Sequence, residues 1–200
     1  MLKNIIFDLG NVIIKWDAKE VVRHCIDKEE EIEILCEAIF MSDGWLKYDQ
    51  GTIEKEQLIK SINDRLDDCY HQIVRNIITD WYRYCPIIEG MEDLMKELKD
   101  RGYKIYLLSN TNLSFDEYKD TIPALAYFDG YYISAVRKLI KPFKEVYLDF
   151  LELYKLKAEE SLFIDDTLVN VVGAKEVGID GYHFVGDVEK LREFIVGYDV

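Results

Sequence analysis

Short apolar runs recur along the chain and have the length of buried strands. The first run, Lys3–Phe7, stops at Asp8, and similar runs follow much later. These later runs are Lys104–Leu108, Gly130–Ile133, Ser161–Ile164 and Tyr182–Val185. A short apolar run without alternation is typical of a parallel strand that is covered on both faces. We therefore predict a strand at each of these positions.

Amphipathic helical patterns stand next to these runs. Glu92–Lys99 is one such helix, ended by Gly102, and Glu145–Tyr154 is another, with Pro142 near its first turn. Glycine after a helix and proline at its start are common boundary signals. Strands and helices in alternation predict an α/β fold, in which a parallel sheet carries helices on both faces.

The stretch from residue 15 to residue 86 has a different pattern. Apolar residues there recur at three- and four-residue spacing, as in Ile32, Leu35 and Ile39, and no strand is evident. We predict a helical domain over 15–86, inserted after the first strand, and a core domain made of 1–14 plus 87–200. In an α/β fold the ligand lies at the carboxyl ends of the strands, so this insertion is expected to lie above the site like a lid.

Composition and charge limit the class of function. The 200 residues suit one α/β domain with a smaller insertion, and 49% hydrophobic residues are sufficient for a substantial core. The formal net charge of −14 argues against a nucleic acid or an anionic membrane surface as the main partner. It does not exclude a small anionic substrate, because a metal ion and a few local donors outweigh the global field.

Cysteine usage and the N-terminus bear on the cellular compartment. Cys25, Cys36, Cys69 and Cys85 lack the close pairs that a zinc site needs, and free thiols in a reducing cytosol are the simplest interpretation. The N-terminal apolar run ends at Asp8 without a small-residue cleavage site, so we expect neither a signal peptide nor a membrane span. We therefore expect a cytoplasmic protein, as a monomer or a weak dimer.

Carboxylates follow two of the predicted strands. Asp8 ends the first strand, where a carboxylate can attack phosphorus or bind a metal, although aspartate also caps strands and helices. Asp165 and Asp166 are adjacent at the end of a later strand. Each carboxylate of such a pair repels the other and raises its pKa unless a cation lies between them. A hard divalent cation with oxygen ligands relieves this repulsion. The structural alternative is that the pair caps a helix.

A hydroxyl and a lysine complete the pattern. Ser109 and Asn110 follow another strand, where a hydroxyl and backbone amides near a helix N-terminus can bind a phosphate. On its own, a helix cap is the simpler interpretation of these two residues. Lys141 precedes Pro142, and proline is common at a first helical turn. The Lys-Pro pair is therefore informative only through its position in the loop before the last helices. A cation in this loop can neutralise a phosphoryl oxygen.

Four strand ends thus supply a carboxylate, a hydroxyl, a lysine and a carboxylate pair, in that order. This order resembles the four motifs of the haloacid dehalogenase superfamily, and the resemblance extends from Lys3 to Phe184. The helical insertion resembles the C1 cap of that superfamily. The strings FDLGNVI, LLSNTN, KP and FIDDTLVN are most similar to the subgroup that contains a bacterial α-D-glucose-1-phosphate phosphatase.

The resemblance implies a Rossmann-like core and a Mg²⁺-dependent phosphatase whose nucleophile is Asp8. A small phosphate monoester, with a sugar phosphate favoured, would be hydrolysed through an aspartyl phosphate. The implied Mg²⁺ ligands are Asp8, the backbone carbonyl of Gly10, Asp166, and Asp165 either directly or through water. The implied phosphate-binding groups are Ser109, the backbone amide of Asn110, and Lys141.

One position departs from the superfamily pattern. Most phosphatases of the superfamily have a second aspartate two residues after the nucleophile, as general acid and base, and this chain has Gly10 there. General acid catalysis typically contributes about 10²–10⁴-fold in rate, so its absence is expected to lower turnover unless another group replaces the aspartate. Asp17 and His24, near the start of the insertion, are candidate replacements, although both are more simply surface residues.

The substrate and two alternative functions stay open at this point. Trp16, Trp45 and Tyr48 could stack on a sugar or a base, although aromatic residues with this spacing are more often part of a core. A metal-independent 2-haloacid dehalogenase also lacks the second aspartate, but it has no use for the Asp165–Asp166 pair. A catalytically silent binding protein with the same fold is the other alternative.

Overall fold

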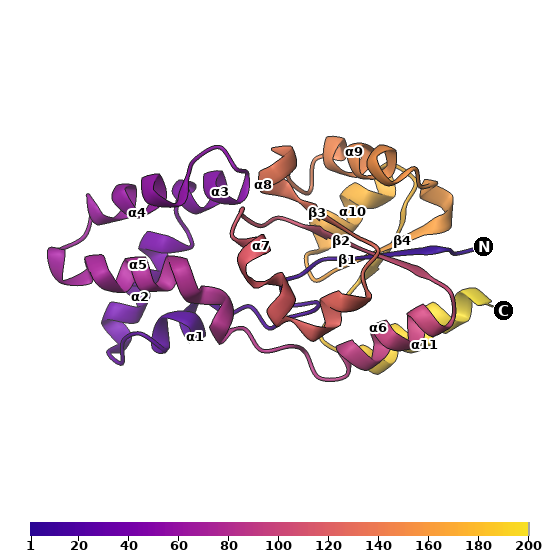
Figure 1. Ribbon diagram of the computed structural model, residues 1–200, viewed down its shortest axis with the longest axis horizontal. Coiled ribbons are helices and arrows are strands. Elements are labelled where there is room, and N and C mark those ends of the chain that lie inside the picture. Colours follow the sequence, from indigo (N-terminus) through magenta and orange to yellow (C-terminus); the bar gives the residue numbers. More distant parts are fainter. Residues whose placement is uncertain (200) are drawn as a thin grey trace.

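Five strands form one parallel sheet at the centre of the computed structural model, which describes residues 1–199 (Figure 1). The strands are β1 (Asn4–Phe7), β2 (Lys104–Ser109), β3 (Gly130–Ile133), β4 (Ser161–Asp165) and β5 (Asp180–His183), in the spatial order β3-β2-β1-β4-β5. The predicted α/β fold with a parallel sheet is confirmed. The last strand begins and ends two residues before the predicted Tyr182–Val185, because Leu162 pairs with Asp180 at its start and Val185 is exposed.

Helices cover both faces of this sheet. The pair α6 (Met91–Asp100) and α11 (Val188–Val196) lies on one face, and α9 (Lys144–Tyr154) lies with α10 (Leu168–Glu176) on the other (Figure 1). The short helices α7 (Phe115–Tyr118) and α8 (Ser134–Arg137) follow β2 and β3. Single 3₁₀ turns complete this part: Lys119–Thr121, Pro123–Tyr127, Ala158–Glu160 and Gly197–Asp199.

Alternate residues of each strand enter separate hydrophobic cores, as the pleat of a strand requires. Ile5 and Phe7 of β1 belong to the core that includes Met91 of α6, whereas Ile6 between them packs with Phe150 of α9. All three are fully buried. Coverage on both faces explains why the strands appear in the sequence as continuous apolar runs rather than as alternating patterns.

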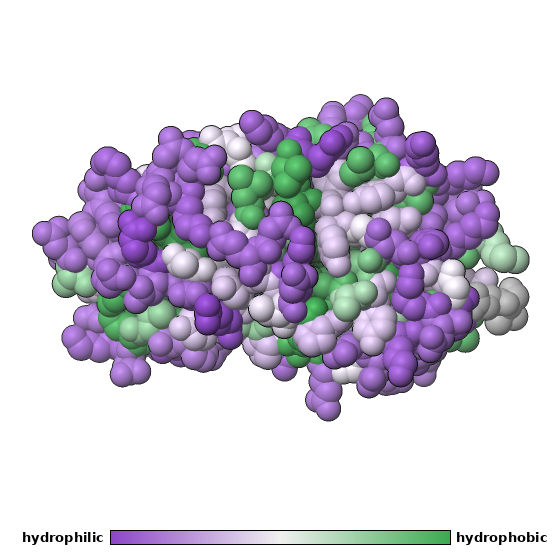
Figure 2. Space-filling view, in the orientation of Figure 1, coloured by the Kyte–Doolittle hydropathy of each residue, from purple (hydrophilic) through white to green (hydrophobic). Residues whose placement is uncertain are grey.

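Residues between β1 and α6 form a helical insertion at one end of the sheet (Figure 1). Its helices are α1 (Ala18–Arg23), α2 (Glu29–Ile39), α3 (Asp43–Asp49), α4 (Lys55–Asn63) and α5 (His71–Asp80), with 3₁₀ turns at Asp68–Tyr70 and Trp81–Tyr84. The visible face of the molecule is mostly hydrophilic (Figure 2). None of the helices within residues 1–199 combines the length and apolar character needed to cross a membrane.

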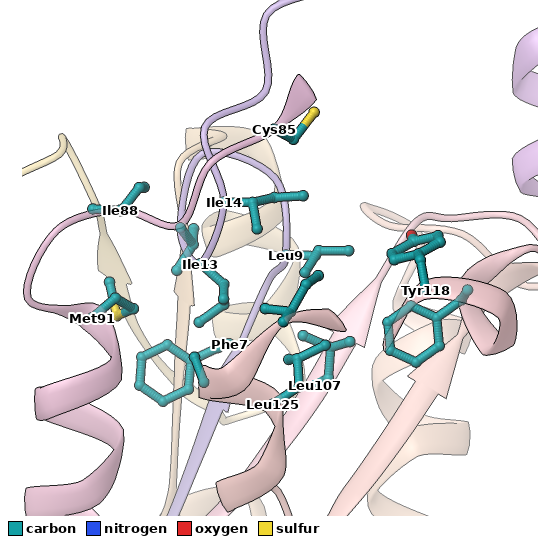
Figure 3. Packing of buried hydrophobic residues seen from close by; sticks show 14 of the residues in the cluster. Phe7, Leu9, Ile13, Ile14, Cys85, Ile88, Met91, Leu107, Tyr118 and Leu125 are labelled. Carbon is teal, nitrogen blue, oxygen red and sulfur yellow. The ribbon is translucent and has the colours of Figure 1, made fainter. Parts of the chain in front are cut away.

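The two segments that join the insertion to the sheet run side by side. Ile14 pairs with Ile87 in an antiparallel bridge, and backbone amides of Lys15 and Ile88 donate across it to Pro86 and Ile13 at 2.8 and 2.9 Å. Apolar side chains of both segments pack over the end of β1 (Figure 3). This pairing supports our proposal that the domains meet at 14/15 and 86/87; residue 200 of the proposed core lies outside the described residues.

Gly173 lets α10 approach the loop that carries Lys141. A Cβ atom at this glycine would lie 2.5 Å from the carbonyl oxygen of Pro142 and 3.0 Å from the ring of Tyr147. The first contact is with backbone, which cannot move aside as a flexible side chain does. Only glycine therefore permits this packing, and the loop after Pro142 depends on it.

We predict that Gly173→Ala lowers the free energy of unfolding by about 1–3 kcal/mol, the usual cost of overpacking. Gly197→Ala is the matched control, because Gly197 has right-handed helical backbone angles and no atom within 4 Å of an added Cβ. That control is expected to be neutral or slightly stabilising. Urea denaturation of both variants measures the difference, and equal stabilities would contradict the packing argument.

Candidate active site

The chain turns sharply after β1 and leaves Asp8 at the carboxyl edge of the sheet. The backbone amide of Asp8 still donates to Ile164 of β4 at 2.9 Å, so this residue continues the ladder. Asn11 follows with φ of 53°, a left-handed conformation that asparagine tolerates better than most residues. Its side-chain oxygen accepts a hydrogen bond from the amide of Trp16 at 2.9 Å. The turn thus fixes Asp8 and the start of the insertion together.

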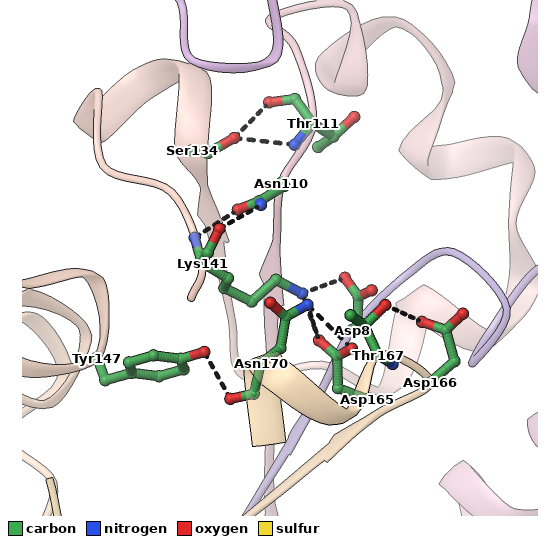
Figure 4. Close-up of polar contacts among 10 residues, drawn as sticks. All are labelled: Asp8, Asn110, Thr111, Ser134, Lys141, Tyr147, Asp165, Asp166, Thr167 and Asn170. Carbon is green, nitrogen blue, oxygen red and sulfur yellow. Dashed lines mark hydrogen bonds and ion pairs between the residues drawn. The ribbon is translucent and has the colours of Figure 1, made fainter. Parts of the chain in front are cut away.

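Lys141 lies between two carboxylates at this edge (Figure 4). Its Nζ is 2.8 Å from Oδ1 of Asp8 and 2.7 Å from Oδ2 of Asp165, and the ammonium group is buried. Burial disfavours the charge on Lys141, but the two carboxylates outweigh this effect and raise the pKa of the lysine. Lys141 is therefore a charged group that joins the ends of β1 and β4.

Asn110 positions Lys141 through the backbone. Its side-chain amide donates to the carbonyl oxygen of Lys141 at 3.1 Å, and its side-chain oxygen accepts from the amide of Lys141 at 2.9 Å. The side chain of Asn110 is thus occupied, which leaves its backbone amide for a ligand. Ser109, the last residue of β2, is buried beside it and lines the same cavity as Asp8.

Asp165 is fully buried and is held from several sides. Oδ1 accepts a hydrogen bond from the amide of Thr167 at 2.8 Å, and the side-chain amide of Asn170 lies 3.1 Å from both carboxylate oxygens (Figure 4). The hydroxyl of Tyr147 donates to the carbonyl oxygen of Asn170 at 2.7 Å and so fixes this residue in turn. Sequence reasoning assigned no role to Asn170, although an asparagine four residues after the Asp165–Asp166 pair was a usable signal.

Three carboxylates gather at this edge in a way that suits a hard cation. One oxygen from each of Asp8, Asp165 and Asp166 lies within 4.8 Å of the others. The pKa of Asp8 is raised to about 6 by burial and by the charge of Asp165, which together outweigh the lowering effect of Lys141. Three carboxylates against one ammonium leave excess negative charge, which a divalent cation with oxygen ligands would neutralise. The donor set therefore fits Mg²⁺, and Gly10 lines the same cavity.

A cavity of about 360 Å³ opens above these groups. Its walls come from both parts of the chain: Asp8, Gly10, Ser109, Asn110, Lys141 and Asp166 from the sheet side, and Trp16, Trp45, Asp49 and Trp81 from the insertion. All the predicted site residues except Asp165 therefore line this cavity, and Asp165 contacts Lys141 at 2.7 Å. Asp49 and Trp81 were not foreseen, because nothing near them in the sequence marks them.

The three aromatic residues that the sequence suggested for stacking have different positions. Trp16 and Trp45 line the cavity with nearly parallel rings whose centroids are 6.2 Å apart. Tyr48 is buried instead, and its hydroxyl forms a 2.8 Å hydrogen bond with Ser114. Tyr48 thus belongs to the contact between the insertion and the sheet rather than to the cavity wall.

The two candidates for a replacement acid lie elsewhere. Asp17 is the N-cap of α1, where its side chain accepts hydrogen bonds from the amides of Lys19 and Glu20. His24 follows the same helix, contacts the carbonyl oxygen of Glu20 at 2.7 Å and stacks on Tyr84. Both residues line a hollow that does not include Asp8. The expectation that one of them supplies the missing proton donor is therefore not supported by their positions.

A family model for haloacid dehalogenase-like hydrolases matches residues 2–178 of the chain. The chain belongs to this family. The matched range begins before β1 and ends after α10, so it contains all four strand-end motifs and the helical insertion. The family resemblance that the order of the four motifs indicated is confirmed.

Relatives of this hydrolase include named phosphatases. The sesquiterpene phosphatase astK of Aspergillus oryzae is 29% identical over 202 residues, which cover 96% of this chain and 94% of the relative. The D-ribitol-5-phosphate phosphatase of Bacteroides thetaiotaomicron is 23% identical and is covered over 91% of both chains. Among solved structures, a haloacid dehalogenase family enzyme of the same bacterium, in complex with magnesium and inorganic phosphate, is 25% identical with a TM-score of 0.73. That alignment covers 93% of this chain and 96% of the other.

We predict that Asp166→Ala abolishes measurable Mg²⁺ binding, because the carboxylate of Asp166 accepts only a long hydrogen bond, 3.3 Å from the hydroxyl of Thr167, among the described residues and is left for the metal. Asp165→Asn is expected to weaken binding less but to destabilise the fold, because Asp165 also pairs with Lys141 and accepts from Asn170. Calorimetric titration with Mg²⁺ and urea denaturation separate the two effects. Unchanged Mg²⁺ affinity in Asp166→Ala would place the metal elsewhere.

Proposed function

We propose that this hydrolase is a Mg²⁺-dependent phosphatase that cleaves a small phosphate monoester through an aspartyl phosphate on Asp8. One observation carries the proposal. A carboxylate, a buried ammonium group 2.8 Å away and two further carboxylates share one edge of the sheet beneath an open cavity. This set provides a nucleophile, a charge partner for a phosphoryl group and a site for a divalent cation.

In the first step, a carboxylate oxygen of Asp8 attacks phosphorus while the bond from phosphorus to the leaving-group oxygen breaks. Lys141, the hydroxyl of Ser109 and the backbone amide of Asn110 would hold the phosphoryl oxygens and stabilise their charge. Bound Mg²⁺ would add charge neutralisation at the same oxygens. In phosphoryl transfer, positioning and electrostatic stabilisation supply most of the catalysis.

In the second step, a water molecule attacks phosphorus and the bond from phosphorus to Asp8 breaks, which restores the free carboxylate. Lys141 then holds the released phosphate only weakly, because Asp8 again competes for its ammonium group at 2.8 Å. The aspartate thus serves as a leaving group in this step after serving as a nucleophile in the first. Both steps use the same charged groups, so no rearrangement of the sheet edge is required.

The two alternative functions fit the site less well. A metal-independent dehalogenase has no role for Asp166, whose carboxylate adds negative charge beside Asp8. A silent binding protein has no reason to keep a nucleophile and a buried lysine in contact, since two buried charges are costly to desolvate. Stimulation of turnover by Mg²⁺ and its loss in chelator separate all three functions.

The cavity favours a leaving group that carries a ring. Trp16 and Trp45 offer indole faces, on which a sugar ring can pack. Trp81 adds a third indole side chain to the wall of the same cavity. We therefore retain a sugar phosphate as the proposed substrate class.

We also propose that the enzyme works in the cytoplasm, as a monomer or a weak dimer. The four cysteines are free thiols, which suits a reducing compartment. The net charge of −14 favours a small-molecule substrate over a nucleic acid or an anionic membrane as partner.

We predict that Asp8→Asn removes phosphatase activity and leaves the fold intact. The amide occupies the same volume and still accepts from Lys141, but it is no nucleophile. Release of phosphate from p-nitrophenyl phosphate, with Mg²⁺ and with chelator, measures the effect. A folded Asp8→Asn protein with wild-type turnover would exclude Asp8 as the nucleophile, and wild-type turnover that is indifferent to chelator would exclude the metal.

A further inference from the structure

The insertion adds a carboxylate to the cavity that Asp8 and Asp166 line from the sheet side. Asp49 is the last residue of α3, so it comes from the insertion, and its side chain lines the cavity together with Asp8 and Lys141. Gly10 offers no side chain there, and Asp17 and His24 line a different hollow. Within the described residues, Asp49 is therefore the titratable side chain that the insertion contributes to this cavity.

The sheet domain fixes the side chain of Asp49. The side-chain amide of Asn112 donates to Oδ1 of Asp49 at 3.1 Å, across 63 residues of sequence. Asn112 is fully buried, and its own side-chain oxygen accepts from the amide of Ser114 at 3.1 Å. That second bond orients the amide, so its NH₂ group must face Asp49. The contact holds the carboxyl group in one position without neutralising a charge.

The backbone around Asp49 is also in close contact with the sheet domain. The hydroxyl of Ser134 donates to the carbonyl oxygen of Asp49 at 2.5 Å. Two residues further on, Gly51 has φ of +67°, and a Cβ atom there would lie 2.1 Å from the carbonyl oxygen of Ala135. Only glycine allows this approach. Asp49 is thus supplied by the insertion but held by the sheet domain.

The surroundings of Asp49 raise its pKa into the neutral range. Burial raises the pKa of Asp49 to about 7, although hydrogen bonds from the side chains of Asn112 and Trp45 lower it. A carboxyl group with a pKa near the working pH is suited to give and take a proton. The titratable groups that face it are Tyr48 beside it, Tyr118 of α7, and Asp8, Lys141 and Asp166 across the cavity.

We propose that Asp49 is the general acid and base of this hydrolase and takes the part that Gly10 cannot play. The inference rests on the proposed phosphatase function. As the bond to the leaving group breaks and Asp8 binds phosphorus, the carboxyl group of Asp49 gives its proton to the leaving oxygen. As water then attacks phosphorus and Asp8 departs, the carboxylate of Asp49 takes one proton from that water. Each turnover therefore returns Asp49 to its protonated form.

Asp49→Asn tests the proposal, because asparagine keeps the oxygen that accepts from Asn112 and loses only the acidic proton. We expect kcat/KM for alkyl and sugar phosphates to fall by about 10²–10⁴-fold, the usual worth of general acid catalysis. For p-nitrophenyl phosphate, whose leaving group needs no proton, the fall should stay below tenfold. A merely structural role would lower all esters alike, and that result would overturn the proposal.

The pH profile gives a second readout. An acid must be protonated to act, so wild-type kcat/KM for alkyl phosphates should fall as pH rises through about 7. In Asp49→Asn this fall should be absent. The variant should also release p-nitrophenolate in a burst equal to the enzyme concentration, because water attack on the aspartyl phosphate then lacks its base. An unchanged pH profile without a burst would contradict the assignment.

A rescue experiment uses the space at position 10. A Cβ atom at Gly10 would meet only the side chain of Trp16, at 3.6 Å and beyond, which is ordinary contact. Gly10→Asp in the Asp49→Asn background should therefore raise kcat/KM for alkyl phosphates at least tenfold above that of the single variant Asp49→Asn. If the single variant Gly10→Asp is active and the double variant shows no gain, the lost function is not proton transfer and the proposal fails.

Tyr48→Phe is the matched control for the contact between the insertion and the sheet. It removes the hydrogen bond to Ser114 and Tyr48 does not itself line the cavity, so the variant should affect alkyl and aryl esters equally. The proposed function has its own test, since Asp8→Asn must abolish turnover of every ester. Activity that requires Asp8 but shows no leaving-group dependence in Asp49→Asn would therefore overturn only the role of Asp49.

Discussion

The buried contact of Lys141 with Asp8 and Asp165 is the interaction on which the site depends. β1 and β4 are neighbours in the sheet, so their terminal carboxylates are forced together. One ammonium group, 2.8 and 2.7 Å from the two, makes that proximity tolerable. Removal of one partner from such a buried set typically costs about 3–5 kcal/mol, because an unpaired charge is left behind. The carboxylate of Asp166 keeps the total charge negative, and this excess attracts a divalent cation.

The helical insertion completes the cavity that the sheet begins. It leaves and re-enters the sheet domain through paired segments at Ile14 and Ile87. A further contact lies at the end of α3, where Asp49 and Gly51 touch residues that follow β2 and β3. The same contact that closes the cavity therefore positions a carboxyl group in it. Closure and proton transfer would be coupled through Asp49.

Much of the fold and of the site could be predicted from the sequence because the signals are local. Buried parallel strands give continuous apolar runs, and a polar residue at the end of such a run lies at the carboxyl edge of the sheet, as Asp8 and Asp165 do. Asp49 gave no such signal, since it ends an exposed-looking helix and its role depends on Asn112, 63 residues away. Asp17 was misleading as a candidate acid because it lies close to Gly10 in the sequence, whereas its side chain serves as the N-cap of α1.

The most direct test of the central claim is to trap the covalent intermediate. Enzyme mixed with Mg²⁺ and p-nitrophenyl phosphate is quenched in acid within one turnover, digested and analysed by mass spectrometry. The account predicts a phosphoryl group on the peptide that contains Asp8, present only with Mg²⁺ and more abundant in Asp49→Asn. Turnover without any phosphorylated peptide, or with the phosphoryl group on another residue, would contradict it.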